Sequence, residues 1–171
     1  MQEYPNAITM HGNPLTLAGK EIKVGDRAPD FEALNNDLEP VKLSDYKGKV
    51  VVISSVPSLD TPVCDMQTRR FNTKAAQLGE DVVILTLSMD LPFAQKRWCG
   101  ASGVNKVITL SDHKDAAFAD AFGLLIKELR LLARAVFIVD REGVVRYRQL
   151  VKEVSNEPDY EEAFSAVADV L

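Results

Sequence analysis

Four short runs of apolar, mostly β-branched residues alternate with segments of helical periodicity, and this alternation constrains the fold more than any other feature. The runs are Val50–Val56, Val82–Met89, Val107–Leu110 and Ala135–Asp140. Continuous apolar runs of this kind are typical of strands that are buried on both faces. Strands that alternate with helices indicate parallel β-α-β crossovers. The sequence therefore predicts an α/β fold with a central sheet.

The segments between and after these runs carry the spacing of amphipathic helices. The four expected helices cover residues 64–78, 92–99, 114–122 and 156–171. Gly79, Gly100 and Gly123 directly follow three of them, as expected for glycine at a helix C-terminus. Asp90 is expected to cap the second helix at its N-terminus, and Cys99 falls in the last turn of that helix.

Two segments depart from the parallel pattern. The stretch 135–151 contains only the short turn 141–143, which is too short for a crossover, so its two strands must be antiparallel. Residues 8–19 predict a hairpin around a Gly12–Asn13 turn. The expected architecture is a mixed central sheet flanked by helices on both faces, preceded by an N-terminal β-hairpin.

Length and charge exclude several classes of protein. Residues 1–171 contain no linker or repeat and are expected to form a single domain, with residues 1–19 as a hairpin extension. The formal charge is −5 and no basic cluster exceeds the pair Arg69–Arg70, which argues against nucleic acid binding. No apolar run approaches the length of a membrane helix, and the N-terminus lacks the pattern of a secretory signal. We therefore expect a cytoplasmic protein that binds neither nucleic acid nor membranes.

Cys64 lies where an α/β sheet usually forms its site. It follows the predicted strand Val50–Val56, and ligand sites form beyond the carboxyl ends of such strands. It also starts a predicted helix, whose free N–H groups carry partial positive charge. A thiol in such a position ionises more readily than a free cysteine, whose pKa is about 8.5. We expect Cys64 to be a reactive thiolate, provided that a cation outweighs repulsion from Asp60 and Asp65.

Three more residues are candidates for the same site, and each has a plain structural alternative. Arg134, at the head of a predicted strand, could hold the thiolate and donate hydrogen bonds to an oxygen substrate, or could simply cap the strand in water. Thr61 could orient an O–O bond, or could serve as a helix cap or loop hydroxyl. Pro57 could wall the pocket and limit water, or could only end the strand.

The two cysteines, Cys64 and Cys99, lie 35 positions apart, which matches neither a C-x-x-C pair nor a compact metal knuckle. Spacing alone leaves open whether these thiols are inert core residues or reactive groups. A disulfide reductase of thioredoxin type is weakened by the absence of C-x-x-C. A metal or interaction module built from both cysteines, His11 and His113 is also conceivable, although their spacings pair nothing closely.

The pattern Pro57-x-x-x-Thr61-x-x-Cys64, with an arginine on a later strand, resembles the active-site signature of the peroxiredoxins. Longer runs resemble their bacterial thiol peroxidase branch, an atypical two-cysteine group: SVPSLDTPVC, QTRRFN, SMDLPFAQKRWCG, VITLSD, LARAVFIVD and EPDYEEAF. The resemblance covers nearly the whole chain. It implies a thioredoxin-like fold with an N-terminal hairpin, and reduction of hydrogen peroxide and organic hydroperoxides without haem, flavin or metal.

The resemblance also implies a role for each candidate residue. Cys64 would be the peroxidatic cysteine and Cys99 the resolving cysteine, while Thr61 and Arg134 complete the peroxide pocket and Pro57 shields it. The sulfenic acid formed on Cys64 would be captured by Cys99 as an intramolecular disulfide, which thioredoxin would reduce. A homodimer active in antioxidant defence is implied as well. Because a disulfide requires Cα atoms within about 7 Å, we expect the turns at both cysteines to unwind on oxidation.

Overall fold

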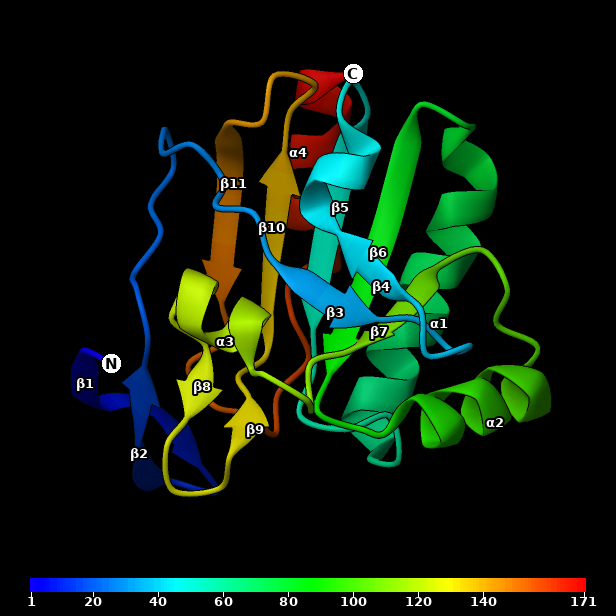
Figure 1. Cartoon of the computed structure of the whole chain (residues 1–171). Helices are drawn as coiled ribbons and strands as arrows, with labels where there is room; N and C mark the ends of the chain where they lie inside the picture. Colours follow the sequence, from blue (N-terminus) through cyan, green and yellow to red (C-terminus); the bar gives the residue numbers. More distant parts are fainter.

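The computed structural model describes all residues 1–171, and a seven-stranded sheet is its frame (Figure 1). Its strands are β3 (Glu32–Leu34), β4 (Pro40–Lys42), β5 (Val50–Ser55), β6 (Val82–Ser88), β7 (Ile108–Ser111), β10 (Ala135–Val139) and β11 (Val145–Leu150). They lie in the order β11-β10-β5-β6-β7-β3-β4. The three central strands β5, β6 and β7 are parallel, whereas β10 is antiparallel to both β5 and β11. The predicted mixed sheet is confirmed, and each apolar run forms a strand to within one residue.

Four helices pack around this sheet. They are α1 (Pro62–Leu78), α2 (Pro92–Ser102), α3 (Ala117–Phe122) and α4 (Tyr160–Val170), and a single 3-10 turn covers Leu43–Tyr46. Val50 and Val52 of β5 belong to the core cluster shared with α1 and α4, whereas Val51 and Ile53 belong to the cluster shared with α3. Both faces of β5 are therefore covered, which explains why its sequence is apolar without alternation. No helix is long and apolar enough to span a bilayer.

The helix boundaries differ from the predicted ones in ways that the local residues explain. Helix α1 begins two residues before Cys64, because Pro62 fits the first turn, where its missing N–H group costs nothing. Helix α2 continues through Gly100 and ends at Ser102, and Gly103, whose φ is 73°, forms the left-handed cap. Helices α3 and α4 both start later than predicted, and the Asp159 side chain caps α4 by accepting from the Glu162 N–H group.

The prediction that Asp90 caps α2 is wrong. The N-cap position is Leu91, and no side chain caps this helix. The Asp90 carboxylate instead accepts hydrogen bonds from the Ser58 hydroxyl at 2.7 Å and from the Leu59 N–H group at 2.8 Å. Asp90 therefore fixes the loop between β5 and α1 to the end of β6.

The N-terminal hairpin is confirmed, but its turn lies one residue earlier than predicted. Strands β1 (Glu3–Met10) and β2 (Asn13–Ala18) pair from Met10 and Asn13, so the turn residues are His11 and Gly12. Both have positive φ, 51° and 82°, as a two-residue hairpin turn of this hand requires.

A second, unpredicted sheet anchors this hairpin. Its order is β1-β2-β8-β9, and β8 (Leu125–Ile126) and β9 (Leu131–Leu132) form a short ribbon of their own. Leu124, Ile126 and Leu132 in and beside this ribbon are fully buried, whereas the loop 127–130 between its strands is exposed. The hairpin joins the main core through this ribbon.

Candidate active site

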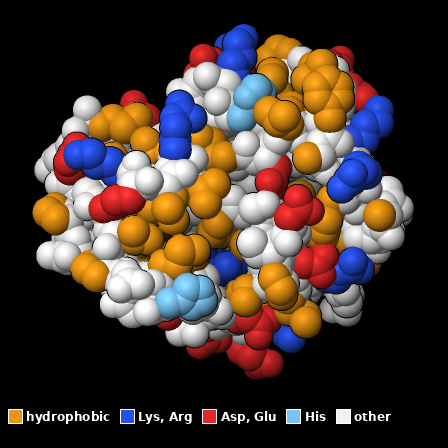
Figure 2. Space-filling view, turned by 90° about the horizontal axis from the view of Figure 1, so that it is seen from below, with side chains coloured by type: hydrophobic (Ala, Val, Ile, Leu, Met, Phe, Trp, Pro, Cys, Tyr) orange, Lys and Arg blue, Asp and Glu red, His pale blue; other side chains and the backbone are white.

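The lower end of the molecule in Figure 1 gathers the carboxyl ends of β5 and β6 and the beginnings of α1 and α2. The chain leaves β5, passes the buried Pro57, and enters α1 at Thr61. Cys64 is thereby held in the first turn of α1, as the sequence predicts. Figure 2 looks onto this end and shows apolar side chains interspersed with charged ones.

A direct contact joins Cys64 and Arg134. The Arg134 Nη2 group donates to the Cys64 Sγ atom at 3.3 Å, and both side chains are buried, with exposed fractions of 2% and 0%. The structure thus rejects the alternative in which Arg134 keeps its charge in water. It brings together two residues that lie 70 positions apart in the chain.

The other partners of Arg134 are neutral. Its Nη1 group donates to the Gln67 Oε1 atom at 2.9 Å, and its Nε group donates to the Val154 carbonyl at 3.0 Å. No carboxylate forms an ion pair with this guanidinium. Cys64 is therefore the only ionisable side chain that is hydrogen-bonded to this buried cation.

Gln67 is a site residue that sequence reasoning missed. It is fully buried, accepts from Arg134, and donates from Nε2 to the Ser54 hydroxyl at 2.7 Å. Its position three residues after Cys64 places both on one face of α1, and this spacing is the signal that could have found it. Gln67 therefore links the guanidinium to the end of β5.

Thr61 and Pro57 belong to the segment that leads into α1, and neither forms a hydrogen bond to Cys64. The Thr61 hydroxyl donates to the Ser58 carbonyl at 3.0 Å, and Thr61 is the N-cap residue of α1 without a side-chain capping bond. Pro57 is buried between β5 and the loop that Asp90 holds. Both residues shape the entry to α1 in this structure.

The two carboxylates that could oppose a thiolate are differently placed. The Asp65 carboxylate is paired with Arg69, whose Nε group donates to it at 2.8 Å, and it also accepts from the Trp98 Nε1 group at 2.9 Å. The Asp60 side chain is exposed to solvent. Pairing and solvent screening therefore weaken the predicted repulsion at Cys64.

Cys99 faces a different neighbourhood from Cys64. Both thiols are free, and the Cys99 Sγ atom lies 3.5 Å from the Thr109 hydroxyl, which in turn donates to the Asn36 side chain. Cys99 and Thr109 line a hollow of about 270 Å³ beside β7. The two thiols therefore lie in different surroundings in this structure, Cys64 against Arg134 and Cys99 against Thr109.

The residues of the metal alternative do not come together. No group of three or more His, Cys, Asp and Glu side chains is arranged to hold a metal ion. His11 lies in the hairpin turn, where its N–H group donates to Glu153, and Cys64 is engaged by Arg134. The geometry of this end of the molecule supports thiol chemistry instead.

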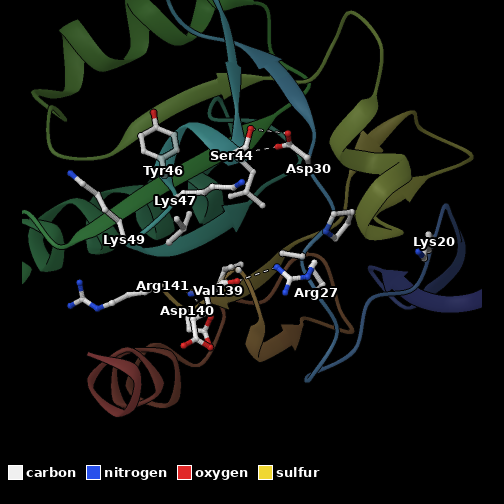
Figure 3. A pocket seen from close by; sticks show the side chains of 16 residues that line it. Lys20, Arg27, Asp30, Ser44, Tyr46, Lys47, Lys49, Val139, Asp140 and Arg141 are labelled. Atoms are coloured by element: carbon white, nitrogen blue, oxygen red, sulfur yellow. Dashed lines mark hydrogen bonds between the residues drawn. The ribbon is translucent and has the colours of Figure 1, made fainter.

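A larger cavity, of about 710 Å³, lies at the opposite end of the sheet and contains neither cysteine (Figure 3). Lys47, Lys49 and Arg141 are among the residues that line it. Although burial opposes ionisation of Asp30, hydrogen bonds from Ser44 lower the pKa of this wall residue. The cavity is thus separate from the site at Cys64.

Comparison with known proteins gives a consistent result. The Redoxin family model matches residues 23–164. The thiol peroxidase of Bacillus subtilis is 60% identical over 159 residues, covering 93% of this chain and 95% of that protein. The thiol peroxidase of Staphylococcus aureus is 51% identical over 163 residues, covering 95% and 98%. A crystal structure of a peroxiredoxin-like protein from Aquifex aeolicus has a TM-score of 0.92 and 44% identity, covering 97% and 98%.

The thioredoxin-like sheet and the buried thiol beside a guanidinium define an oxidoreductase of the peroxiredoxin type. Such an enzyme uses a hydroperoxide as oxidant and a thiol as reductant. The chain belongs to the Redoxin family and, within it, to the thiol peroxidases.

Proposed function

We propose that Cys64 is the peroxidatic residue and that it acts on hydrogen peroxide and organic hydroperoxides. The thiolate electron pair attacks the terminal peroxide oxygen, an S–O bond forms and the O–O bond breaks. The departing alkoxide or hydroxide takes up a proton and leaves as an alcohol or water, and Cys64 becomes a sulfenic acid. Sulfur is oxidised and the peroxide is reduced, so no resident cofactor is needed for this step.

The contact between Cys64 and Arg134 is the observation that carries this proposal. A guanidinium keeps its charge and has five N–H donors, so it can hold the thiolate and also stabilise negative charge on the departing oxygen. Preorganised donors of this kind often supply the largest part of catalysis. Gln67 and the Val154 carbonyl hold the guanidinium in place for that role.

We assign Cys99 as the resolving residue. Its thiol attacks the Cys64 sulfenic acid, an S–S bond forms, the S–O bond breaks, and water leaves. The supporting observation is that both cysteines are free and that the chain has no third thiol. Thioredoxin, a dithiol reductant, would then reduce the disulfide and complete the cycle.

Thr61 and Pro57 are proposed to complete the pocket. The Thr61 hydroxyl, at the start of α1, is within one helical turn of Cys64 and can exchange its bond to the Ser58 carbonyl for one to a peroxide oxygen. The buried Pro57 limits water on the strand side. Both roles concern orientation of the substrate.

The remaining parts of the proposal concern the whole protein. We propose an antioxidant enzyme of the cytoplasm, where a reducing environment keeps two free thiols available. Residues 1–171 would act as one domain, since Ile8 and Leu17 of the N-terminal hairpin belong to the main core cluster. Exposed apolar residues beside the site support a homodimer.

Peroxide reduction coupled to thioredoxin tests the chemistry. Wild-type protein should consume hydrogen peroxide at steady state, Cys64→Ser should be inactive, and Cys99→Ser should complete one turnover and then stall. Activity of Cys64→Ser would remove the assigned nucleophile, and full steady-state activity of Cys99→Ser would remove the resolving role. Insulin reduction, measured in parallel, should be weak; a fast reaction would favour a disulfide reductase.

A further inference from the structure

Trp98 occupies the place beside Cys64 that the resolving thiol must reach. Its ring packs against the small apolar cluster formed by Val56, Leu59 and Cys64, although Trp98 belongs to α2 and not to the Cys64 loop. The next residue, Cys99, contacts Thr109 instead. Successive residues of a helix point about 100° apart, so an intact α2 cannot exchange Trp98 for Cys99.

Two contacts hold Trp98 in that place, and both come from side chains in the first two turns of α1. The Trp98 Nε1 group donates to the Asp65 Oδ1 atom at 2.9 Å. The other Asp65 oxygen accepts from the Arg69 Nε group at 2.8 Å, and the Arg69 guanidinium lies 5.8 Å from the centre of the Trp98 ring. Arg69 also donates to the Ser102 carbonyl at 3.2 Å, near the end of α2.

Asp65 directly follows Cys64, and Trp98 directly precedes Cys99. The bond between Asp65 and Trp98 therefore joins the helix of the peroxidatic thiol to the helix of the resolving thiol. We propose that Asp65, Trp98 and Arg69 form a latch that keeps Cys99 away from Cys64, so that opening of the latch limits the rate of disulfide formation. This proposal rests on the assignment of Cys64 and Cys99 made above.

The latch affects one step of the cycle and not the other. Peroxide attack needs only Cys64 and its surroundings in the folded pocket, whereas disulfide formation needs the last turn of α2 to unwind and Trp98 to leave. When disulfide formation with Cys99 is slow, the Cys64 sulfenic acid persists longer, so a second peroxide molecule can over-oxidise it irreversibly. The latch thus determines how the sulfenic acid divides between recycling and inactivation.

The test is a single-turnover experiment on the reduced full-length protein. One equivalent of hydrogen peroxide is added, samples are quenched with an alkylating reagent, and mass spectrometry follows sulfenic acid and disulfide with time. Trp98→Phe keeps an aromatic ring but removes the indole N–H donor. We expect its disulfide formation to be about tenfold faster than in wild type, equivalent to about 1.4 kcal/mol, relative to the rate of peroxide attack. Its over-oxidation under excess peroxide should fall accordingly.

Two matched variants separate the latch from general weakening of a helix. Arg97→Gln changes an exposed neighbour on α2 that is not part of the latch, and its disulfide formation should stay within about twofold of wild type. Asp65→Asn, which keeps an acceptor oxygen but loses the charge paired with Arg69, should lie between wild type and Asp65→Ala. Trp98 is the only tryptophan in the chain, so its fluorescence reports opening directly in the Asp65 variants.

The possible outcomes are distinct. If wild type forms no sulfenic acid and no Cys64–Cys99 disulfide, the assigned chemistry fails. If wild type forms both, but Trp98→Phe makes the disulfide at the wild-type rate or more slowly, the latch is refuted and the assigned chemistry stands. Equal acceleration in Arg97→Gln and Trp98→Phe would likewise refute the latch, because the effect would then come from loosening of α2 alone.

Discussion

Arg134 is one of the largest side chains that the fold buries, and it is there without a carboxylate partner. Two of its three nitrogen groups are fixed by neutral oxygens, and the third faces the Cys64 sulfur. At the scale of single residues, the proposed chemistry therefore depends on one buried cation that contacts the proposed nucleophile directly.

Replacement of Arg134 tests this dependence. Arg134→Gln removes the charge, and we expect the rate constant for Cys64 oxidation to fall about 100-fold, the usual effect of losing one preorganised donor. Arg134→Lys keeps a cation but cannot hold the Gln67 and Val154 oxygens together, so its loss should be smaller. Stopped-flow kinetics with hydrogen peroxide measure both, and Arg141→Gln, at the far end of the sheet, is the control. Wild-type kinetics in folded Arg134→Gln would contradict the assigned role.

Asp112 gives a second prediction at this scale. Burial raises the pKa of Asp112 to about 6, although N–H groups of Phe118 and Ala119 bond its carboxylate and act in the opposite direction. The unfolded value is near 3.8. Between about pH 4 and pH 6, Asp112 therefore keeps a proton in the folded protein that it releases in the unfolded chain. The free energy of unfolding decreases as pH rises through this window, by up to about 3 kcal/mol from this group.

The side chain in Asp112→Asn cannot titrate, so the variant should lose the part of the pH dependence of stability that comes from Asp112. Urea unfolding across the same pH window should show that the free energy of unfolding decreases with rising pH in wild type more than in the variant. A difference that is constant with pH would mean that Asp112 is already ionised throughout the window in the folded state.

At the scale of elements, the N-terminal hairpin depends on one carboxylate. Glu153 accepts from the Thr9 hydroxyl, from the N–H groups of His11 and Gly12, and from Ser155. Hydrogen bonds from the Ser155 hydroxyl and N–H group, followed by the bond from Gly12, hold the pKa of Glu153 well below its ordinary value. The carboxylate therefore stabilises the hairpin at neutral pH, and this stabilisation is lost as pH falls towards the lowered pKa.

Glu153→Gln should loosen the hairpin turn without disturbing the central sheet. The neutral amide is a weaker acceptor, so amide exchange at His11 and Gly12 should become several-fold faster, a change within the usual strength of a hydrogen bond to a charged group. Exchange in β5 and β6 should stay as in wild type. Unchanged protection at the turn would show that backbone pairing of β1 and β2 suffices to hold it.

The elements that the sequence predicts well are those whose signal is local. Strand β5 follows from a continuous apolar run and α1 from its apolar spacing, and both appear within two residues of the prediction. The elements that were missed depend on tertiary partners. Strands β8 and β9 have two residues each, and they form because β8 pairs with β2 on one side and with β9 on the other. Asp90 bonds a loop that comes from another part of the chain.

The site divides in the same way. The place of Cys64 follows from the strand and helix pattern, and its pairing with Arg134 was proposed from the position of an arginine at the head of a strand. The contacts of Asp65 with Trp98 cross 33 positions and depend on how α1 and α2 approach each other. No local sequence pattern predicts this contact, since each of the two residues alone is typical of an ordinary helix surface.

At the scale of the whole molecule, apolar exposure is marked at the end that carries the thiol. Met66, Leu91 and Phe93 are 49%, 53% and 66% exposed in the single chain. Met66 lies in the first turns of α1, and the other two lie at the start of α2, next to the residue that fixes the Cys64 loop. Exposed apolar clusters of this kind commonly mark protein interfaces.

Phe93→Glu tests whether this face holds the proposed homodimer. A charge at the centre of an apolar interface should shift the protein to monomer, with a dissociation constant at least about 100-fold higher, because burying an unpaired carboxylate is costly. Analytical ultracentrifugation measures the shift. Val24→Glu, on an apolar residue that is 59% exposed and lies beside β11, should leave association unchanged. A dimer of undiminished affinity in Phe93→Glu would place the interface elsewhere.

The neutral surroundings of Arg134 have a consequence for the oxidised enzyme. In the proposed cycle, neither a sulfenic acid nor a disulfide carries the negative charge of the thiolate. Oxidation of Cys64 would therefore leave the buried Arg134 guanidinium without a countercharge, bonded only to a carbonyl oxygen and an amide oxygen. In the proposed cycle, oxidation of Cys64 therefore destabilises the folded arrangement around Arg134 and favours its local unfolding. Reduction of the disulfide restores the charge on sulfur and stabilises the folded arrangement again.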